Sequence, residues 1–384
     1  MSEFPVVSWT ESGAVQTARW RSESGLPPPK RVLVADDRMS AAAAYKLACE
    51  GTTLLWRGDF QNARQLLQAM ARRIDHVPRH AIKAPVAKPA PVPPGTAFHL
   101  HRQAQAQRAR VLAMLVLPFA ADHSVPLRRA PDVRQACLEA YGPADGPYLA
   151  SLRELLGVIG AHEWRKAGVA VPGLAGRIHP HYGVFAPIRS EYVGLVFRTP
   201  LPVPPPALAF DIGTGTGVLA AVLAARGIAR VVATEQDPRA LACALDNVQR
   251  LGCAAQVEVL RADLFPPGRA PLVVCNPPWL PVRPSSPIEH AIYDPDSRML
   301  RGFLQGLPAH LTPGGEGWLL LSDLAERLGL RTRDDLLAAI AGAGLRVLGR
   351  ADARPTHPRA ADTTDPLHAA RAAEITSLWR LAAA

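Results

Sequence analysis

The C-terminal half of the sequence predicts an α/β fold in which helices cover both faces of a doubly wound, mainly parallel sheet. Two observations predict it. Short apolar runs alternate with helical patterns from residue 207 onward, and a glycine-rich turn joins the first run directly to a helix. We expect a separate N-terminal domain, either mixed α/β or mainly helical, to precede this sheet.

The N-terminal half contains weaker signals. We expect a short buried strand at residues 31–35, a helix at 60–74, and helical segments at about 99–117 and 132–164. Residues 77–95 contain six prolines, a composition that favours an extended linker without a core. A second proline-rich stretch, 200–206, comes just before the sheet. We therefore predict a basic domain at residues 1–177, with a linker at 77–95, and a second domain at 178–384.

The sheet of the second domain can be followed along the chain. Strands are expected at 207–211, 231–235, 257–260, 272–275 and 317–321, with helices beginning at Gly217 and Pro238 and a third near 297–310. Two later apolar segments, 345–348 and 375–379, could complete the sheet as an antiparallel pair.

Composition excludes several classes of protein. The chain has 384 residues, of which 48% are hydrophobic, so it can bury a sizeable core. Its longest apolar run, near residues 111–117, is far shorter than the roughly 20 residues of a membrane-spanning helix, and the N-terminus lacks a secretory pattern. We therefore expect a cytoplasmic protein. Five cysteines without CxxC spacing argue against a disulfide framework or structural zinc, and the histidine pairs lack further ligands, so no metal is predicted.

The net charge of +10 is concentrated in the first half of the chain. Residues 1–200 hold 25 Lys and Arg against 15 acids, whereas residues 201–384 hold 18 against 18. The excess is greatest between residues 61 and 135, a pattern that suits binding to a polyanion such as RNA. Arginines scattered over a solvated surface would give the same composition, and both interpretations stay open.

The strongest motif is the glycine-rich turn after the first strand of the second domain. It reads Asp211-Ile-Gly213-Thr214-Gly215-Thr-Gly217, so three alternate glycines allow a ligand to approach the backbone at a helix N-terminus. A dinucleotide fingerprint would read GxGxxG, so a nucleoside that carries an amino acid fits better. Asp211 would organise this loop and water near the ligand's ammonium group. Glycines that serve helix packing alone are the alternative.

Acidic residues also follow the next two strands. Glu235 ends the second strand, where its carboxylate could accept hydrogen bonds from both ribose hydroxyls. Asp263, Leu264 and Phe265 follow the third strand and could border an adenine ring.

A second motif, Asn276-Pro277-Pro278-Trp279, follows the fourth strand. The two prolines stiffen the turn and remove N–H donors, which leaves the Asn276 side-chain oxygen and nearby carbonyls as acceptors. Trp279 would add a flat apolar face. Such a site suits a planar –NH₂ group, because two acceptors can hold both hydrogens and direct the nitrogen lone pair outward. The alternative is a rigid turn with Trp279 in the core.

On these two motifs the second domain resembles the class I S-adenosylmethionine-dependent methyltransferases, in the branch with an Asn/Asp-Pro-Pro-aromatic motif. The resemblance implies a Rossmann-like sheet and S-adenosylmethionine as cofactor. It implies that the donor is bound by Asp211, Gly213, Thr214, Gly215, Gly217, Glu235, Asp263 and Leu264, and the target nitrogen by Asn276, Pro277, Pro278 and Trp279. The upstream segment 179–191 resembles the part of these enzymes that covers the donor, with Phe185 and Pro187 as candidate contacts.

Two subfamilies compete for the substrate. The motif and the later Pro313-Gly-Gly315 turn resemble HemK-type enzymes, which methylate a glutamine of a release factor, although Tyr is usual there in place of Trp279. Residues 32–38 resemble the degenerate first domain of small-domain ribosomal RNA methyltransferases. Because the first domain is long and basic, we expect an N-methyltransferase that acts on an RNA base, in ribosomal or transfer RNA. A protein glutamine is the alternative, and a non-catalytic RNA-binding module is a remote one.

Overall fold

The computed structural model describes residues 5–75, 93–284, 289, 291–355, 362, 363 and 365–384. The chain forms two compact units. The first comprises residues 1–92 and 99–163, and the second comprises 93–98 and 164–384. The division falls between Glu163 and Trp164, earlier than the domain start at 178 that the sequence suggested, because Val169, Val171 and Ile178 pack into the core of the second unit. Most of the proline-rich linker predicted at 77–95 lies outside the described residues.

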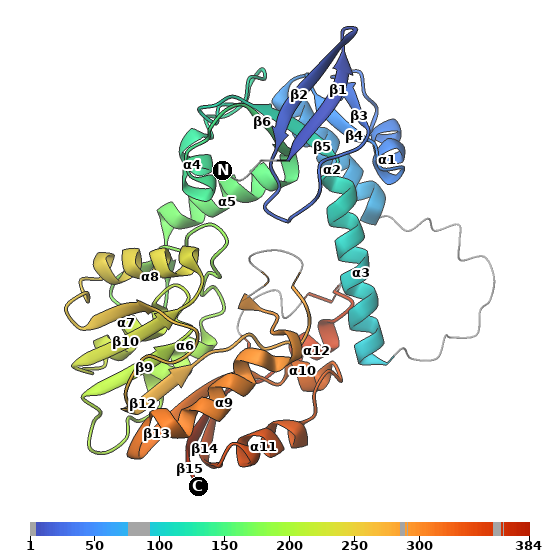
Figure 1. Ribbon diagram of the computed structural model, residues 1–384. Helices are drawn as coiled ribbons and strands as arrows, with labels where there is room; N and C mark the ends of the chain where they lie inside the picture. Colours follow the sequence, from blue (N-terminus) through green and yellow to red (C-terminus); the bar gives the residue numbers. More distant parts are fainter. Residues whose placement is uncertain (1–4, 76–92, 285–288, 290, 356–361, 364) are drawn as a thin grey trace. The chain divides into compact units, whose positions relative to one another are not determined.

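The first unit contains a mixed six-stranded sheet with the order β1-β2-β6-β5-β4-β3 (Figure 1). Its strands are β1 (Val6–Glu11), β2 (Ala14–Trp20), β3 (Val32–Ala35), β4 (Thr53–Trp56), β5 (Leu115–Phe119) and β6 (Tyr148–Ser151). Strands β3, β4 and β5 are parallel, and the helices between them are α1 (Ala41–Cys49), α2 (Phe60–Asp75) and α3 (Pro94–Leu112). The strand at 31–35 and the helix at 60–74 are confirmed.

Several predictions for the first unit are wrong. The segment 99–117 is helical only to Leu112, because its last apolar residues form the fully buried strand β5. The segment 132–164 is interrupted by β6 and holds two helices, α4 (Arg134–Tyr141) and α5 (Leu152–Ala167). The predicted linker extends too far along the chain, because α3 begins at Pro94. Proline is tolerated at the start of a helix, where a backbone N–H would have no partner within the helix. Sequence analysis also missed the β1–β2 hairpin, whose turn holds Ser12 at φ 51° and Gly13 at φ 78°.

The second unit contains the predicted doubly wound sheet, with seven strands in the order β11-β10-β9-β12-β13-β15-β14 (Figure 1). The strands are β9 (Leu208–Ile212), β10 (Arg230–Glu235), β11 (Val257–Arg261), β12 (Ala270–Cys275), β13 (Leu311–Ser322), β14 (Leu345–Ala353) and β15 (Thr376–Ala383). The first five strands in this list are parallel, and β15 runs antiparallel to both β13 and β14. The antiparallel pair expected at the end of the chain is therefore confirmed.

Helices cover both faces of this sheet because successive strand residues point to opposite sides. Ala209, Val231 and Val274 face a core shared with α6 (Glu191–Arg198), α7 (Val218–Ala225) and α8 (Pro238–Arg250). Phe210 and Val273 face the opposite core, which includes residues of α9 (Arg298–His310) and α11 (Arg333–Gly342). Smaller elements complete the unit, namely β7 (Val169–Ala170), β8 (Arg177–Ile178), α10 (Leu324–Arg327) and α12 (His368–Ala372). No helix in the described ranges is both long enough and apolar enough to cross a membrane.

Candidate functional site

The strand register brings the predicted motifs to one edge of the sheet. Ile212, the last residue of β9, pairs with Thr234 of β10 on one side and with Cys275 of β12 on the other. The residues that directly follow these three paired positions are Gly213, Glu235 and Asn276. The glycine loop, the acid and the asparagine thus leave the carboxyl ends of three neighbouring parallel strands, which is where open α/β sheets bind their ligands.

The glycine loop bends through three residues with positive φ. Gly213, Gly215 and Gly217 have φ values of 69°, 58° and 80°, which side chains with a Cβ rarely adopt. A Cβ on Gly217 would lie 3.3 Å from the backbone of Ala244, so this glycine allows α7 and α8 to pack closely. A Cβ on Gly215 would meet no atom within 4 Å among the described residues. Gly215 therefore borders open space, and the loop fits a donor that needs close approach to the backbone.

Asp211 organises the loop from beneath. Its side chain is buried, and its Oδ2 atom accepts hydrogen bonds from Thr214 Oγ1 at 2.6 Å and from the Ala220 N–H at 3.0 Å. Burial raises the pKa of Asp211 to about 6, against these two hydrogen bonds, which lower it. The carboxylate thus holds the loop onto the first turn of α7, which is the loop-organising role expected from the sequence.

Glu235, the last residue of β10, contacts the glycine loop. Its Oε2 atom accepts the Gly215 N–H at 3.0 Å, and its Oε1 atom accepts the N–H groups of Gln236 and Asp237 at 2.9 and 3.0 Å. A carboxylate held by three backbone donors has a fixed direction, and Oε2, which accepts one N–H, retains a lone pair for a further donor. It is therefore placed to accept one hydroxyl group of a ligand that lies against Gly215.

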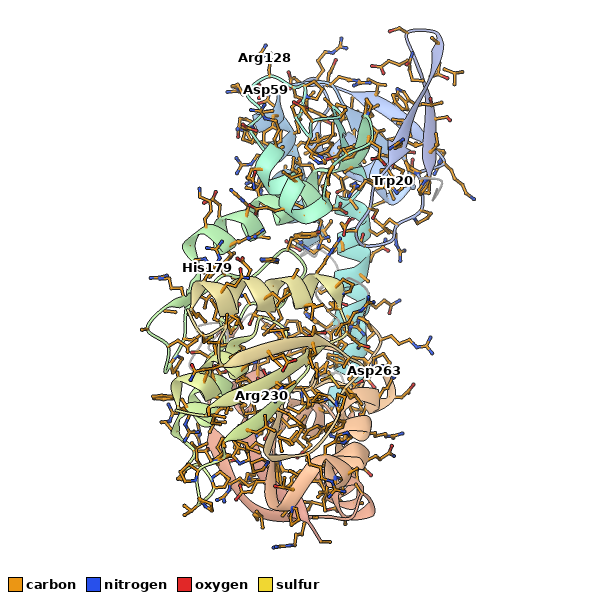
Figure 2. All side chains as sticks on the ribbon, turned by 60° about the vertical axis from the view of Figure 1, so that its left-hand side comes forward. Trp20, Asp59, Arg128, His179, Arg230 and Asp263 are labelled. Carbon is orange, nitrogen blue, oxygen red and sulfur yellow. The ribbon has the colours of Figure 1, made fainter. Side chains whose placement is uncertain are left out.

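The residues after β11 were expected to border an adenine ring, and that contact stays a prediction. The Asp263 carboxylate, labelled in Figure 2, is half exposed and already forms an ion pair with Arg298 at 2.7 Å. Leu264 has φ 70°, and its carbonyl accepts the Thr234 hydroxyl at 2.5 Å. Leu264 and Phe265 both pack against the core beneath α9. The turn is thus anchored to β10, while Asp263 stays at the surface.

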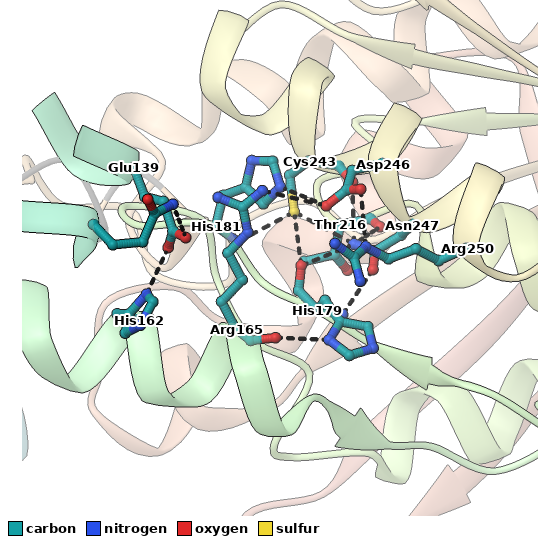
Figure 3. Close-up of polar contacts among 11 residues, drawn as sticks. Glu139, His162, Arg165, His179, His181, Thr216, Cys243, Asp246, Asn247 and Arg250 are labelled. Atoms are coloured by element: carbon teal, nitrogen blue, oxygen red, sulfur yellow. Dashed lines mark hydrogen bonds and ion pairs between the residues drawn. The ribbon is translucent and has the colours of Figure 1, made fainter. Parts of the chain in front are cut away.

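Sequence analysis missed Asn247, which joins the upstream segment to the glycine loop. This fully buried residue of α8 accepts the His179 N–H at 2.7 Å and donates to the carbonyl of Thr216 at 3.1 Å (Figure 3). Its Nδ2 atom also lies 3.3 Å from the carbonyl of His179. One amide thereby fixes the segment that begins at His179 against the loop that holds Gly215. A polar residue on the apolar side of the helical pattern 238–250 was the signal that could have found it.

Two further residues of α8 hold the same segment. His181 Nε2 lies 3.0 Å from Asp246 Oδ2, and the His181 N–H donates to Cys243 Sγ at 3.4 Å (Figure 3). Burial raises the pKa of the Cys243 thiol to about 12, so it stays protonated and structural. Beyond this anchor the candidate donor contacts follow, Phe185 half-buried and Pro187 buried. Their contact with a donor stays a prediction.

The Asn-Pro-Pro-Trp turn leaves β12 beside the glycine loop. Pro277 is buried, whereas Asn276, Pro278 and Trp279 are partly accessible. The Trp279 indole N–H donates to Asn276 Oδ1 at 2.9 Å, a contact that the sequence did not predict. The ring also packs against the cores on both faces of the sheet. Trp279 is thus anchored against the core while part of its ring stays accessible, and its contact with a target nitrogen stays a prediction.

Ion pairs neutralise part of the basic stretch in the first unit. Arg129 lies 2.6 Å from the buried carboxylate of Asp59, and Arg128, labelled with Asp59 in Figure 2, lies 3.7 Å from it. Arg108 pairs with Asp75, and Arg134 pairs with Asp132. The charge available to a polyanion is therefore smaller than composition suggests. Within the described ranges, no cluster of three or more His, Cys, Asp or Glu residues is arranged to hold a metal ion.

Comparisons with known proteins agree with this geometry. Residues 175–326 match the family model of the methyltransferase small domain. A release factor glutamine methyltransferase of Cereibacter sphaeroides is 35% identical over 125 residues, which are 29% of this chain and 45% of that protein. A ribosomal protein L11 methyltransferase of Pelotomaculum thermopropionicum is 45% identical over 76 residues, 19% of this chain and 25% of that protein.

Solved structures match at lower similarity. A methyltransferase from Pyrococcus furiosus is 18% identical with a TM-score of 0.39, and the match covers 60% of this chain and 98% of that one. A ribosomal protein L11 methylase from Lactobacillus delbrueckii subsp. bulgaricus is 17% identical with a TM-score of 0.37, covering 55% and 82%. This chain spans less than half the length of the curated relatives named above. Residues 175–326 of the second unit are thus similar to the methyltransferase small domain, which supports a methyltransferase enzyme with S-adenosylmethionine as its cofactor.

Proposed function

We propose that the chain is an N-methyltransferase of the translation apparatus that modifies the side-chain amide of a glutamine in a release-factor-like protein. The observation that carries the proposal is the register of β9 and β12, because it sets Asn276 next to the glycine loop. Curated relatives of this chain are named for release factor glutamine or for ribosomal protein L11. The RNA base favoured by the sequence has no such support, and paired arginines weaken the charge argument for it.

S-adenosylmethionine, when bound, supplies an electrophilic methyl group on a sulfonium sulfur. The residues of this chain then have to bring the target nitrogen into line with it. Asn276 Oδ1 and the carbonyls of the turn accept the two N–H groups of a carboxamide, which turns the nitrogen lone pair away from conjugation. When bound, the donor would supply its methyl group to this nitrogen and keep the electron pair on sulfur, and the alkylated nitrogen would release one proton to water. No strong base is needed, because that proton becomes acidic only after alkylation. Alignment of this kind can be worth roughly 7–11 kcal/mol.

Methyl transfer from labelled S-adenosylmethionine tests the proposal. The full chain would be incubated with purified release factors and, separately, with total RNA from a strain that lacks the gene. We expect label in a release factor, located to one glutamine by mass spectrometry, and no label after that glutamine is replaced by Ala. The variant N276A should bind the donor as the native chain does and lose turnover by about 100-fold or more, as expected when one preorganised polar contact is removed. Label in RNA alone would contradict the proposal.

A further inference from the structure

The indole of Trp279 contributes a hydrogen-bond donor as well as a flat face. Its Nε1 atom lies 2.9 Å from Asn276 Oδ1, within the turn that follows β12. An indole N–H can only donate, so the atom it faces must be an acceptor. Phenylalanine or tyrosine at this position would offer a ring without a donor at the indole Nε1 position.

This donor matters because an asparagine amide has two ends of nearly equal size. One end is an oxygen that accepts, and the other is an NH₂ group that donates. If the amide of Asn276 turned over, its NH₂ group would face both the indole N–H and the incoming –NH₂ of the substrate. The hydrogen bond from Trp279 favours the orientation that presents oxygen, and it uses one of the two lone-pair positions of that oxygen. The other position remains for a substrate N–H.

The indole itself is held by a charged cluster. The Arg189 guanidinium carbon lies 5.6 Å from the centre of the ring, within the range of a cation–π contact. Arg189 is fixed in turn by Glu191 at 3.0 Å and by Glu374 at 3.1 Å, and both carboxylates are almost fully buried. Glu374 also accepts the hydroxyl of Ser322 at 2.5 Å. A cation over the ring draws electron density from the indole, which makes its N–H a stronger donor.

We propose that Trp279 is a positioning residue that orients the amide of Asn276 so that its oxygen faces the target nitrogen, with Arg189 holding the indole in place. The inference rests on the proposed function, in which Asn276 accepts an N–H of the substrate. It assigns to the Trp of this motif a role in orienting the acceptor, in addition to stacking on the substrate.

A double-mutant cycle separates orientation from general support. We expect W279F to lower kcat for methylation of the release factor by about 10-fold, with the donor Kd and the substrate KM changed less than twofold. A carboxylate has two acceptor oxygens and needs no orientation, so W279F should lower the kcat of N276D, measured against N276D alone, by less than threefold. If Trp279 only supports the turn, W279F should lower kcat by the same factor in the native and N276D backgrounds, and that result would overturn the proposal.

A second measurement does not depend on turnover. The indole ¹⁵N–¹H resonance of Trp279, assigned by its loss in W279F, should move in N276A. The resonance of Trp318, whose N–H donates to Glu316 at 3.1 Å, serves as the internal control and should stay in place. An unchanged Trp279 resonance in N276A would overturn the proposal. If the native chain methylates neither release factor nor RNA, the proposed function fails, and the resonance still decides whether Trp279 holds Asn276.

Discussion

Gly215 allows the donor site to be tested against a matched control. Gly215 has φ 58°, and a Cβ there would meet no atom within 4 Å among the described residues. Gly252, in the turn after α8, has φ 69° and the same free space around a Cβ. A left-handed conformation costs a residue with a Cβ about 1–2 kcal/mol, so G215A and G252A should lose a similar amount of stability. Urea unfolding would measure that loss in both variants.

The two variants should differ only in donor binding. The open space at Gly215 is where the proposed site receives the nucleoside, and the Gly215 N–H contacts Glu235 at 3.0 Å. A methyl group placed there should weaken binding of S-adenosylmethionine and of its demethylated product by at least about 10-fold, or ~1.4 kcal/mol. Isothermal titration calorimetry would measure both ligands, and G252A should bind them as the native chain does. Normal binding by G215A, or equal loss in both variants, would refute the placement of the donor.

Three further predictions concern polar side chains in and around the site. The pKa of Asp211 is raised by burial from 3.8 to about 6, so the folded state holds its proton more tightly and this residue's contribution to stability falls as pH rises from about 4 to about 6. The free energy of unfolding of D211N, relative to native, should therefore increase by about 3 kcal/mol over that range in urea titrations, and a flat difference would contradict the raised pKa. N247A leaves the His179 N–H and the Thr216 carbonyl without their partner, so urea unfolding should show a loss of about 2–4 kcal/mol and calorimetry a weaker donor affinity. N276A should keep native stability within about 1 kcal/mol, because its amide is partly accessible, and a larger loss in thermal unfolding would assign it a structural role.

The sequence predicted the second unit well because each signal there is local. A short apolar strand that contains Asp211 and is followed by alternate glycines predicts a tight turn, since positive φ at three positions strongly favours Gly. Parallel strands then bring Glu235 and Asn276 to the same edge by topology alone. In the first unit the apolar run at 111–117 fits the end of a helix and a buried strand equally well, and only tertiary pairing of β5 with β4 and β6 decides between them.

What the sequence could not provide is the set of contacts that give the site residues their direction. Trp279 acts through its indole N–H and Asn247 through both ends of its amide, and the apolar pattern of a sequence does not reveal the partners of such polar atoms. Both contacts lie where a loop meets a strand end, so they fix loops that the sheet alone leaves free. Strand ends determine which residues meet in this site, and buried amide and indole groups determine which atoms face the substrate. A substitution that keeps an aromatic ring but removes its polar atom is therefore the sharpest test of the chemistry proposed here, and W279F is that substitution for the target-nitrogen site.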